Sequence, residues 1–284
     1  MESNFKIRAS AAGQIMTDGV GKSNTEKIAE ARQKIVDTQA KLMALSEKAV
    51  KMAEKYQGMI AGYDQTIKDC EAQLSLGVDK ELSKTCTSYL MQWWIEATTG
   101  RRKEISSKYL YKGIAVEEDA ILQLALQDES FHTKNERRYE NEWFTGTPDI
   151  ITDTKVIDIK SSWDIFTFTE AKLSPINQSY YLQLQVYMDL VGRDEAELVY
   201  CLLNSPDEVY NNEVRKAEWV TGMQVPLTDE KLRQIHLNHH YDDLPYESRF
   251  KRFSIQRDQE VIDAIKSRVE QCRKFISNNF SNII

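Results

Sequence analysis

The sequence lacks the residue patterns that mark several classes of metal-binding protein. Its four cysteines are widely spaced and form no C-x-x-C pair. Cysteines of this kind are usually single buried thiols, so the spacing supports neither a zinc ribbon nor an iron–sulfur cluster. The four histidines include the cluster His236-Leu-Asn-His239-His240, which is more typical of a solvated polar loop than of a metal site.

Long hydrophobic runs are also absent. No apolar stretch approaches the roughly 18–20 residues that cross a bilayer. The first ten residues (MESNFKIRAS) have no basic segment leading into an apolar one, as a secretory signal would. Hydrophobic residues make up 41% of the 284 positions and charged residues 29%, which is the balance of a soluble folded chain. We therefore expect a cytoplasmic protein with no membrane partner.

Basic residues are fewer than acidic ones over the whole chain, whose net charge is -7. A net negative charge by itself argues against a nucleic-acid partner, because phosphate binding needs local positive potential. The charge is unevenly distributed, however. Residues 1–110 hold 17 Lys and Arg against 14 Asp and Glu, and the remaining 174 residues hold 20 against 30. The net charge of the whole chain is the sum of an acidic part and local basic clusters, so it does not exclude DNA as a partner.

The segment from Ser23 to Leu76 predicts a long amphipathic helix or a helical hairpin. Two series of mostly apolar residues each recur every seven positions: Ile28, Ile35, Leu42, Ala49, Tyr56 and Tyr63, and Ala31, Thr38, Leu45, Met52 and Met59. This a/d pattern indicates a helix with Ser23 or Asn24 as its N-cap, or a hairpin that breaks near Gly58 and Gly62. Such a face packs on another helix of the same chain, which we favour, or on an oligomer or partner.

The rest of the chain predicts a mixed sheet with helices before, between and after its strands. Helices are expected over 80–100, from about 111 to 124, over 175–190 and over 257–279. Strands are expected over 138–143, 146–152, 155–160, 197–203, 219–225 and 250–255. Asp153 and Thr154 provide the turn of a hairpin between the second and third of these strands. The pattern indicates an α/β fold without internal repeats.

Two aspartates and a lysine meet in this predicted hairpin. Asp149, in Gly-Thr-Pro-Asp, starts one strand, and Asp158 and Lys160 share one face of the next, because strand side chains repeat every two residues. Adjacent carboxylates repel each other unless a cation lies between them, and oxygen ligands favour Mg²⁺ or Mn²⁺. The backbone carbonyl of Ile159 is a further candidate ligand, and Lys160 is placed to orient or deprotonate a water or to offset charge on a phosphate. The pattern favours metal-dependent phosphodiester hydrolysis over an ordinary turn beside a charged strand edge.

These residues resemble the signature of the PD-(D/E)XK nuclease superfamily. Lys112-Gly-Ile-Ala-Val-Glu117 is similar to the G-x-x-x-E helix motif of the superfamily's lambda exonuclease/YqaJ and RecB-like branch. Gln183 and Tyr187 fit the Q-x-x-x-Y helix of that branch, and the segment 253–258 resembles its closing strand and helix. Ala9-Ser10 is similar to the short N-terminal serine motif of the phage exonucleases. The resemblance covers roughly residues 105–280 and part of the first 15.

The resemblance implies a restriction-endonuclease-like central mixed β-sheet flanked by helices, with a long N-terminal helical, coiled-coil-like insertion that does not map on the family core. It divides the chain into 1–22, the first part of the nuclease core, 23–76, the insertion, and 77–284, the nuclease domain. An iron–sulfur cluster, which some RecB-like branches hold with a closely spaced C-terminal cysteine set, is not expected, because Cys201 and Cys272 stand alone.

The resemblance also implies which side chains bind divalent ions. Glu117, Asp149 and Asp158 would hold Mg²⁺ or Mn²⁺, with two ions expected. Glu118 is a rival to Glu117, because adjacent helix positions point about 100° apart and only one of them can face the sheet. The G-x-x-x-E spacing favours Glu117.

Three further residues receive roles from the same resemblance. Lys160 would act on the nucleophilic water or on the transition-state charge. Gln183 and Tyr187 would hold the active site or the DNA backbone, with plain helix packing as the alternative for both.

The function implied is a Mg²⁺-dependent DNA exonuclease of the phage-recombination type, of phage or prophage origin in a bacterial host. Its relatives degrade one strand of linear duplex DNA from the 5′ end and pass the exposed strand to an annealing protein. A ring-shaped trimer is implied by the resemblance alone. The alternatives are a restriction-like or structure-specific endonuclease, and a non-catalytic DNA-binding or assembly protein built around the long helix.

Basic residues cluster just before the motif helix and just before the catalytic hairpin. They are Arg101, Arg102, Lys103, Lys108, Lys112, Arg137 and Arg138. Each is either a phosphate contact or part of the solvated surface. Trp93 and Trp94 could stack on bases, although a helix face packed in the core is the favoured interpretation.

Overall fold

The computed structural model describes residues 4–46, 49–75, 80–104, 107–222 and 226–280. They form two compact units. The helical unit comprises Met1–Asn4, Gln14–Gly100 and Glu270–Ile284, and the sheet unit comprises Phe5–Gly13 and Arg101–Val269. The short helix α1 (Ala12–Ile15) and the long helix α11 (Gln259–Phe280) contribute residues to both. The sequence-based division at 22/23 and 76/77 stays a prediction.

The sheet unit is built around a four-stranded mixed sheet. Its strands, in spatial order, are β4 (Ile150–Ile151), β5 (Lys155–Ser161), β6 (Glu195–Cys201) and β7 (Phe250–Gln256). β4 and β5 form an antiparallel hairpin, β5 and β6 are parallel, and β6 and β7 are antiparallel. Thr152 closes the turn, because its N–H and hydroxyl both donate to the carbonyl of Lys155. The predicted α/β fold is confirmed, and the predicted hairpin is present.

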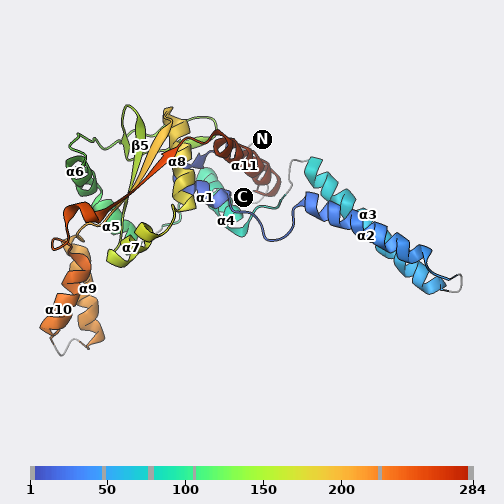
Figure 1. The fold of residues 1–284 in the computed structure, drawn as a ribbon, viewed down its shortest axis with the longest axis horizontal. Helices are drawn as coiled ribbons and strands as arrows, with labels where there is room; N and C mark the ends of the chain where they lie inside the picture. The colour runs from blue at the N-terminus through green and yellow to red at the C-terminus, as the bar shows by residue number, and fades with distance from the viewer. Residues whose placement is uncertain (1–3, 47–48, 76–79, 105–106, 223–225, 281–284) are drawn as a thin grey trace. The chain divides into compact units, whose positions relative to one another are not determined.

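Helices cover both faces of this sheet (Figure 1). The chain crosses from β5 to the parallel β6 through α7 (Ile165–Leu173) and α8 (Gln178–Val191). Because side chains alternate along a strand, β5 sends Ile157 and Ile159 to one face and Asp158 to the other. The first face packs on α6 (Glu117–Gln127), and Asp158 faces α8, where Gln183 contacts it. The polar residues of β5 therefore lie against a helix that supplies hydrogen-bond partners.

The α6 face of the sheet holds an apolar cluster. Its buried members are Val116, Ala120, Ile121, Leu124, Ile150, Ile157, Ile159, Val199, Cys201, Leu203 and Phe250. α5 (Lys108–Ala115) precedes α6, and the single expected helix is divided at Val116, whose backbone is not helical. The division sets the start of α6 beside the catalytic hairpin.

A smaller three-stranded sheet lies beside α8. Its strands, in spatial order, are β1 (Ile7–Arg8), β3 (Phe144–Gly146) and β2 (Tyr139–Glu140), and the 3-10 turn η1 (Ala9–Ala11) follows β1. The strand expected over 138–143 is thus shorter than predicted. At the far end of α8, Gly192 adopts the left-handed conformation that ends the helix.

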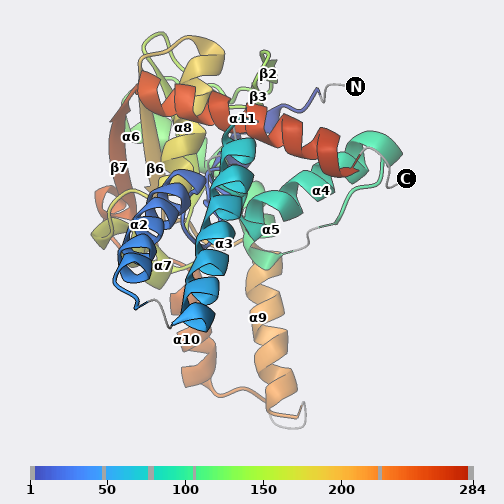
Figure 2. The same cartoon turned by 90° about the vertical axis from the view of Figure 1, so that its right-hand side faces the viewer.

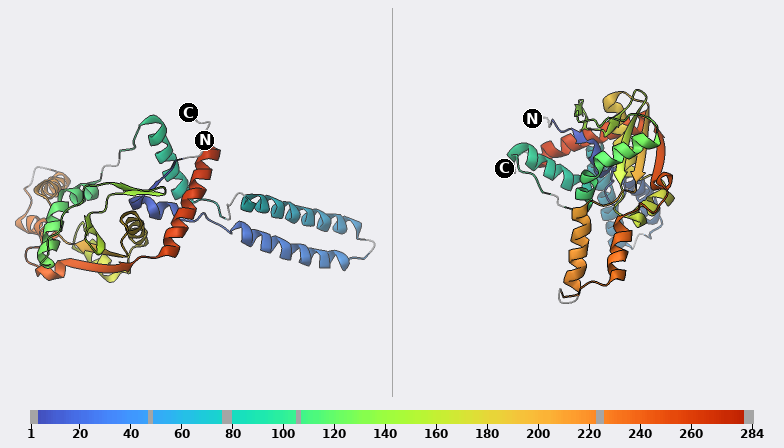
Figure 3. Two further views of the ribbon diagram at one scale, coloured as in Figure 1. Left: turned by 90° about the horizontal axis from the view of Figure 1, so that it is seen from above. Right: turned by 90° about the vertical axis from the view of Figure 1, so that its left-hand side faces the viewer.

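The connection from β6 to β7 is helical. It consists of α9 (Asp207–Val220), α10 (Asp229–His239) and the 3-10 turn η2 (Tyr246–Arg249). The strand expected over 219–225 is wrong where it can be compared, because Trp219 and Val220 are the last residues of α9; residues 223–225 lie outside the described residues. The histidine cluster belongs to the end of α10 and not to a loop, and His239 is buried. α9 and α10 run side by side (Figures 1 and 3).

The helical unit contains a hairpin of two long helices, α2 (Asn24–Met43) and α3 (Val50–Ser75), which run side by side (Figures 2 and 3). Ser23 is the N-cap of α2, and its side chain and that of Glu26 each bond the other's backbone N–H. The buried and half-buried seam residues of α2 are the predicted ones: Ile28, Ala31, Ile35, Thr38 and Leu42.

Two expectations about this hairpin are wrong. The chain turns between α2 and α3, and Gly58 and Gly62 lie inside α3. The turn also changes the heptad register, because Met52 and Met59 are exposed. The α3 residues that are not exposed are Ala53, Tyr56, Ile60, Tyr63, Ile67, Cys70 and Leu74. The first predicted series therefore keeps its place at Tyr56 and Tyr63, and the second is displaced by one residue, to Ala53 and Ile60.

The same unit contains α4 (Lys84–Thr99) and the last residues of α11. Trp94 packs against Phe280 with ring centroids 5.6 Å apart, which supports the packing interpretation of the tryptophan pair. Cys86 and Cys272 are buried free thiols whose sulfurs lie 3.8 Å apart. In the described part of the chain, no helix combines the length and apolar character needed to cross a membrane.

Candidate active site

The hairpin of β4 and β5 places two carboxylates beside each other. Asp149 immediately precedes β4, and its Oδ2 accepts a hydrogen bond of 2.8 Å from the backbone N–H of Ile159 in β5. Asp158 is only 1% exposed. The predicted pairing of these acids across the hairpin is present in the structure.

Lys160 completes the centre of the site. It lies two residues after Asp158 on the same face of β5, and its Nζ is 2.7 Å from Asp158 Oδ2. Burial opposes its charge, but Asp158 and Asp149 outweigh that effect and raise the pKa of Lys160 above its ordinary value. Lys160 therefore holds its proton at neutral pH.

α8 holds Asp158 from the other side. Gln183 Nε2 lies 3.1 Å from Asp158 Oδ1 and 3.1 Å from the hydroxyl of Tyr187, which donates to the carbonyl of Thr147 at 3.2 Å. Gln183 and Tyr187 are both buried, so their side chains support the site from inside the protein. Gly146 makes this close packing available, because a Cβ there would lie 2.7 Å from Tyr187 Cε1.

Glu117 lies at the edge of the same site. Its Oε2 is 3.2 Å from Lys134 Nζ, and its charge helps to raise the pKa of Asp149. Glu117 is half-buried, whereas its neighbour Glu118 is exposed. The geometry therefore supports Glu117 over Glu118, in agreement with the motif spacing.

The two aspartates destabilise each other's charge. Burial comes first and the charge of Asp158 second in raising the pKa of Asp149 to about 7, against the opposing effects of Lys160 and the Ile159 N–H. A cation between the carboxylates would relieve this repulsion.

The donor set fits a hard divalent cation. Among the described residues, no hydrogen bond of regular geometry reaches the buried Asp158 Oδ2, whose neighbour is the Lys160 ammonium. This oxygen and Asp149 are the kind of ligand that Mg²⁺ and Mn²⁺ prefer. Within the same described residues, no three acidic, histidine or cysteine side chains gather closely enough to hold an ion by themselves. Glu117 would have to give up its ion pair with Lys134 in order to bind the ion together with Asp149 and Asp158.

Two residues of the site carried no sequence signal. Lys134 pairs with Glu117 and forms an isolated β-bridge with Ile150. The next residue, Asn135, donates from its backbone to the carbonyl of Asp149 at 2.8 Å and from its side chain to the carbonyl of Pro148 at 2.9 Å. The segment 134–135 therefore fixes the backbone that carries Asp149.

The predicted phosphate contacts divide into two groups. Lys112 does not fit, because its side chain is 1% exposed and its ammonium donates to the carbonyl of Trp163 at 2.7 Å; burial lowers its pKa to about 8. The remaining cations are exposed: Arg101, Arg102, Lys103, Lys108, Arg137 and Arg138. Two of these have neighbours in the sheet unit, since Lys108 lies over the Trp163 ring and Arg138 Nε donates to Thr145.

Known structures resemble the whole chain. No protein-family model matches the sequence, and no curated protein matches it. A phage-related exonuclease from Haemophilus somnus 129PT is similar with a TM-score of 0.62 at 23% identity, covering 99% of this chain and 97% of its own. An alkaline exonuclease from Laribacter hongkongensis has a TM-score of 0.54 at 15% identity, covering 96% and 88%. The resemblance predicted from the motifs is confirmed at the level of the fold: this chain has the fold of these two exonucleases over almost its whole length.

Proposed function

We propose that this protein is a divalent-metal-dependent deoxyribonuclease that hydrolyses phosphodiester bonds. The observation that carries the proposal is the buried pair of Asp149 and Asp158 with Lys160 Nζ 2.7 Å from Asp158. The fold shared with two exonucleases supports it independently.

The residues of the chain have separate tasks in this proposal. Asp149, held by the Ile159 N–H, and Asp158, held by Gln183, would bind Mg²⁺ or Mn²⁺, with the carbonyl of Ile159 and the carboxylate of Glu117 as further ligands. A bound divalent ion supplies Lewis acidity and lowers the pKa of water. Lys160 keeps its proton, which supports a role as a positive hydrogen-bond donor to phosphate or water over that of a general base.

The finer proposal is an exonuclease that degrades linear double-stranded DNA, from 5′ to 3′, and produces single strands for phage-type recombination. The two similar structures are exonucleases, and one is phage-related. On this proposal the partners are duplex ends, a single-strand annealing protein and further copies of the chain in a ring, and the protein works in the cytoplasm of a bacterial host.

Cleavage of linear and closed circular duplex DNA with Mg²⁺ tests the proposal. We expect the linear form to be degraded from its ends and the circle to persist. Asp158→Asn should abolish this degradation, whereas Asp153→Asn, an exposed aspartate in the turn of the same hairpin, should not. Equal degradation of circles would indicate an endonuclease, and an intact linear substrate or an active Asp158→Asn variant would contradict the proposal.

A further inference from the structure

A row of aromatic rings leads away from Lys160 across the sheet. Lys160 Nζ lies 4.9 Å from the centroid of the Tyr180 ring, which contacts Tyr200 edge to face at 6.1 Å. Tyr200 contacts Phe253 in the same manner at 6.1 Å, and Lys251 Nζ lies 4.8 Å from the centroid of Phe253. These five residues form what we call the aromatic strip, with a cation at each end.

The strand register shows that the strip is continuous. Lys160 pairs with Tyr200, and Tyr200 pairs with Lys251, so the three side chains share the face of the sheet that carries Asp158. Two steps between neighbouring strands span about 10 Å. That length matches roughly three stacked bases at about 3.4 Å each.

The strip is suited to contact with nucleic acid. Its three rings are half-buried, so part of each ring remains accessible. Among the described residues, Lys251 has no carboxylate partner, whereas neighbouring cations on the sheet do: Lys155 pairs with Glu197, and Arg252 pairs with Asp128. An unpaired ammonium over a ring offers a phosphate contact beside a stacking surface.

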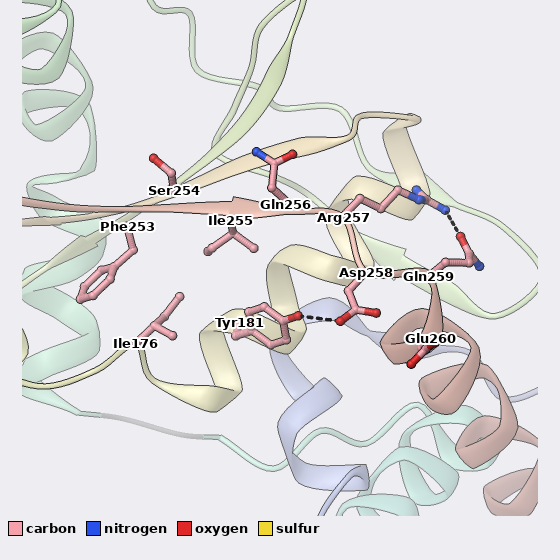
Figure 4. Close-up of a pocket in the computed structure, with 10 residues that line it drawn as sticks. All are labelled: Ile176, Tyr181, Phe253, Ser254, Ile255, Gln256, Arg257, Asp258, Gln259 and Glu260. Atoms are coloured by element: carbon pink, nitrogen blue, oxygen red, sulfur yellow. Dashed lines mark hydrogen bonds between the residues drawn. The ribbon is translucent and has the colours of Figure 1, made fainter.

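A pocket of about 650 Å³ opens at the Phe253 end of the strip (Figure 4). Phe253 lines it from β7, and Ile176 and Tyr181 line it from the segment that begins α8. Asp258 and Glu260 also line it, and Asp258 accepts hydrogen bonds from the Tyr181 hydroxyl and the Val261 N–H. Arg257 also lines the pocket, but its guanidinium pairs with Asp189. The two carboxylates therefore disfavour a phosphate inside the pocket and leave it suited to an uncharged base.

We propose that the aromatic strip binds two to three unpaired nucleotides of a single DNA strand. The bases stack on Tyr180, Tyr200 and Phe253, with one in the pocket, and a backbone phosphate lies on Lys251. The position of this DNA strand next to the cleaved phosphodiester rests on the proposed nuclease function, because Lys160 belongs both to the candidate active site and to the aromatic strip. Binding of the strand to the aromatic strip does not rest on that function.

Binding of a fluorescent single-stranded oligonucleotide, measured by anisotropy in EDTA, tests the strip without any cleavage. Phe253→Leu keeps apolar volume and removes the ring, and we expect roughly tenfold weaker binding. Phe253→Tyr should bind like the wild type, which separates ring loss from misfolding. Phe131→Leu, at a highly exposed phenylalanine outside the strip, is the matched control and should change nothing.

The salt dependence of binding tests the phosphate contact. Lys251→Gln should lower the slope of log K against log salt by about 0.7, the value for one phosphate on a single strand. Wild-type affinity in Phe253→Leu, or a loss that affects duplex and not single-stranded DNA, would overturn the proposal. The binding assay does not require cleavage. If the wild type cleaves no DNA but binds the oligonucleotide, and Phe253→Leu binds it more weakly, the proposed nuclease function is rejected and the proposed binding by the aromatic strip is supported.

Discussion

Two lysines of this protein have nearly the same neighbours and different surroundings. Lys160 lies 2.7 Å from Asp158 and over the Tyr180 ring, and Lys34 lies 2.9 Å from Glu30 and over the Tyr63 ring. The Lys160 side chain is 24% exposed, whereas that of Lys34 is 49% exposed. The contacts of the two lysines are alike, so the two sites differ in burial and in the second carboxylate, Asp149, that acts on Lys160.

Acids in the two hairpins have pKa values that are shifted in opposite directions. On α2, hydrogen bonds from Lys22 and Lys34, together with their charges, lower the pKa of Glu30 to about 2, because they outweigh the small opposing effect of burial. In the catalytic hairpin, burial and a second carboxylate raise the pKa of Asp149 to about 7. The α2–α3 hairpin thus keeps its charges satisfied in water, and the catalytic hairpin keeps an unsatisfied charge that a divalent ion can satisfy.

The largest expected effect separates the two lysines directly. Lys160→Met should reduce DNA cleavage by at least about 100-fold, because it removes the positive charge beside the two aspartates. Lys34→Met should leave both cleavage and the thermal midpoint unchanged, since surface pairs contribute little. Cleavage rates and melting curves of both variants test this prediction. Similar losses of activity in the two variants would contradict the different roles given to Lys160 and Lys34.

The α2–α3 hairpin should be sensitive at its seam and tolerant outside it. Ile28→Ala empties a buried seam position and should lower the free energy of unfolding by roughly 2–3 kcal/mol. Val36→Ala changes a side chain that is 58% exposed and should stay within about 0.5 kcal/mol of the wild type. Denaturant unfolding followed by circular dichroism compares them. Equal losses of unfolding free energy in the two variants would contradict the assignment of Ile28 to the buried seam.

The free-energy cost of charging Asp149 beside Asp158 should make stability depend on pH. Asp149 has a folded pKa near 7 and an ordinary value of 3.8, so its contribution to stability is fully present below about pH 4 and is lost as the pH rises through 7. Asp149→Asn cannot ionise and should be more stable than the metal-free wild type at pH 8, and not at pH 4. Unfolding curves in EDTA at both pH values measure this, and an advantage that does not change with pH would contradict the assignment.

The smallest effect concerns the support from α8. Tyr187→Phe removes the hydroxyl that links Gln183 to the carbonyl of Thr147 and should cost about 1 kcal/mol of stability. Cleavage should fall several-fold, because Gln183 is left free to turn away from Asp158. Tyr56→Phe, on α3 of the helical hairpin, is the control, and equal rates in both variants would argue against this support.

The sequence predicts the centre of the site well, because its geometry is local. Asp149, Asp158 and Lys160 lie within twelve residues of one hairpin, where the two-residue period of a strand decides which side chains share a face. Glu117 follows from a helical motif. Lys134 and Asn135 could not be found in this way, because they reach the site through one β-bridge and have no periodic pattern.

Two errors in the fold have a similar cause. Trp219 and Val220 look like the start of a strand, but they complete a helix that begins just after Pro206, and an exposed apolar end is tolerated there. Gly58 and Gly62 look like a break in the long helix, but the chain turns elsewhere, and both glycines face open space within α3. Local composition does not reveal which residues the tertiary structure covers.

Calorimetric titration of Mn²⁺ into the protein tests the central claim, that the paired aspartates form a cation site, most directly. We predict saturable binding to the wild type and to Asp153→Asn, accompanied near pH 7 by release of the proton that Asp149 partly retains. Binding should be lost in Asp158→Asn. Absence of saturable binding to the wild type, or unchanged binding to Asp158→Asn, would contradict the claim.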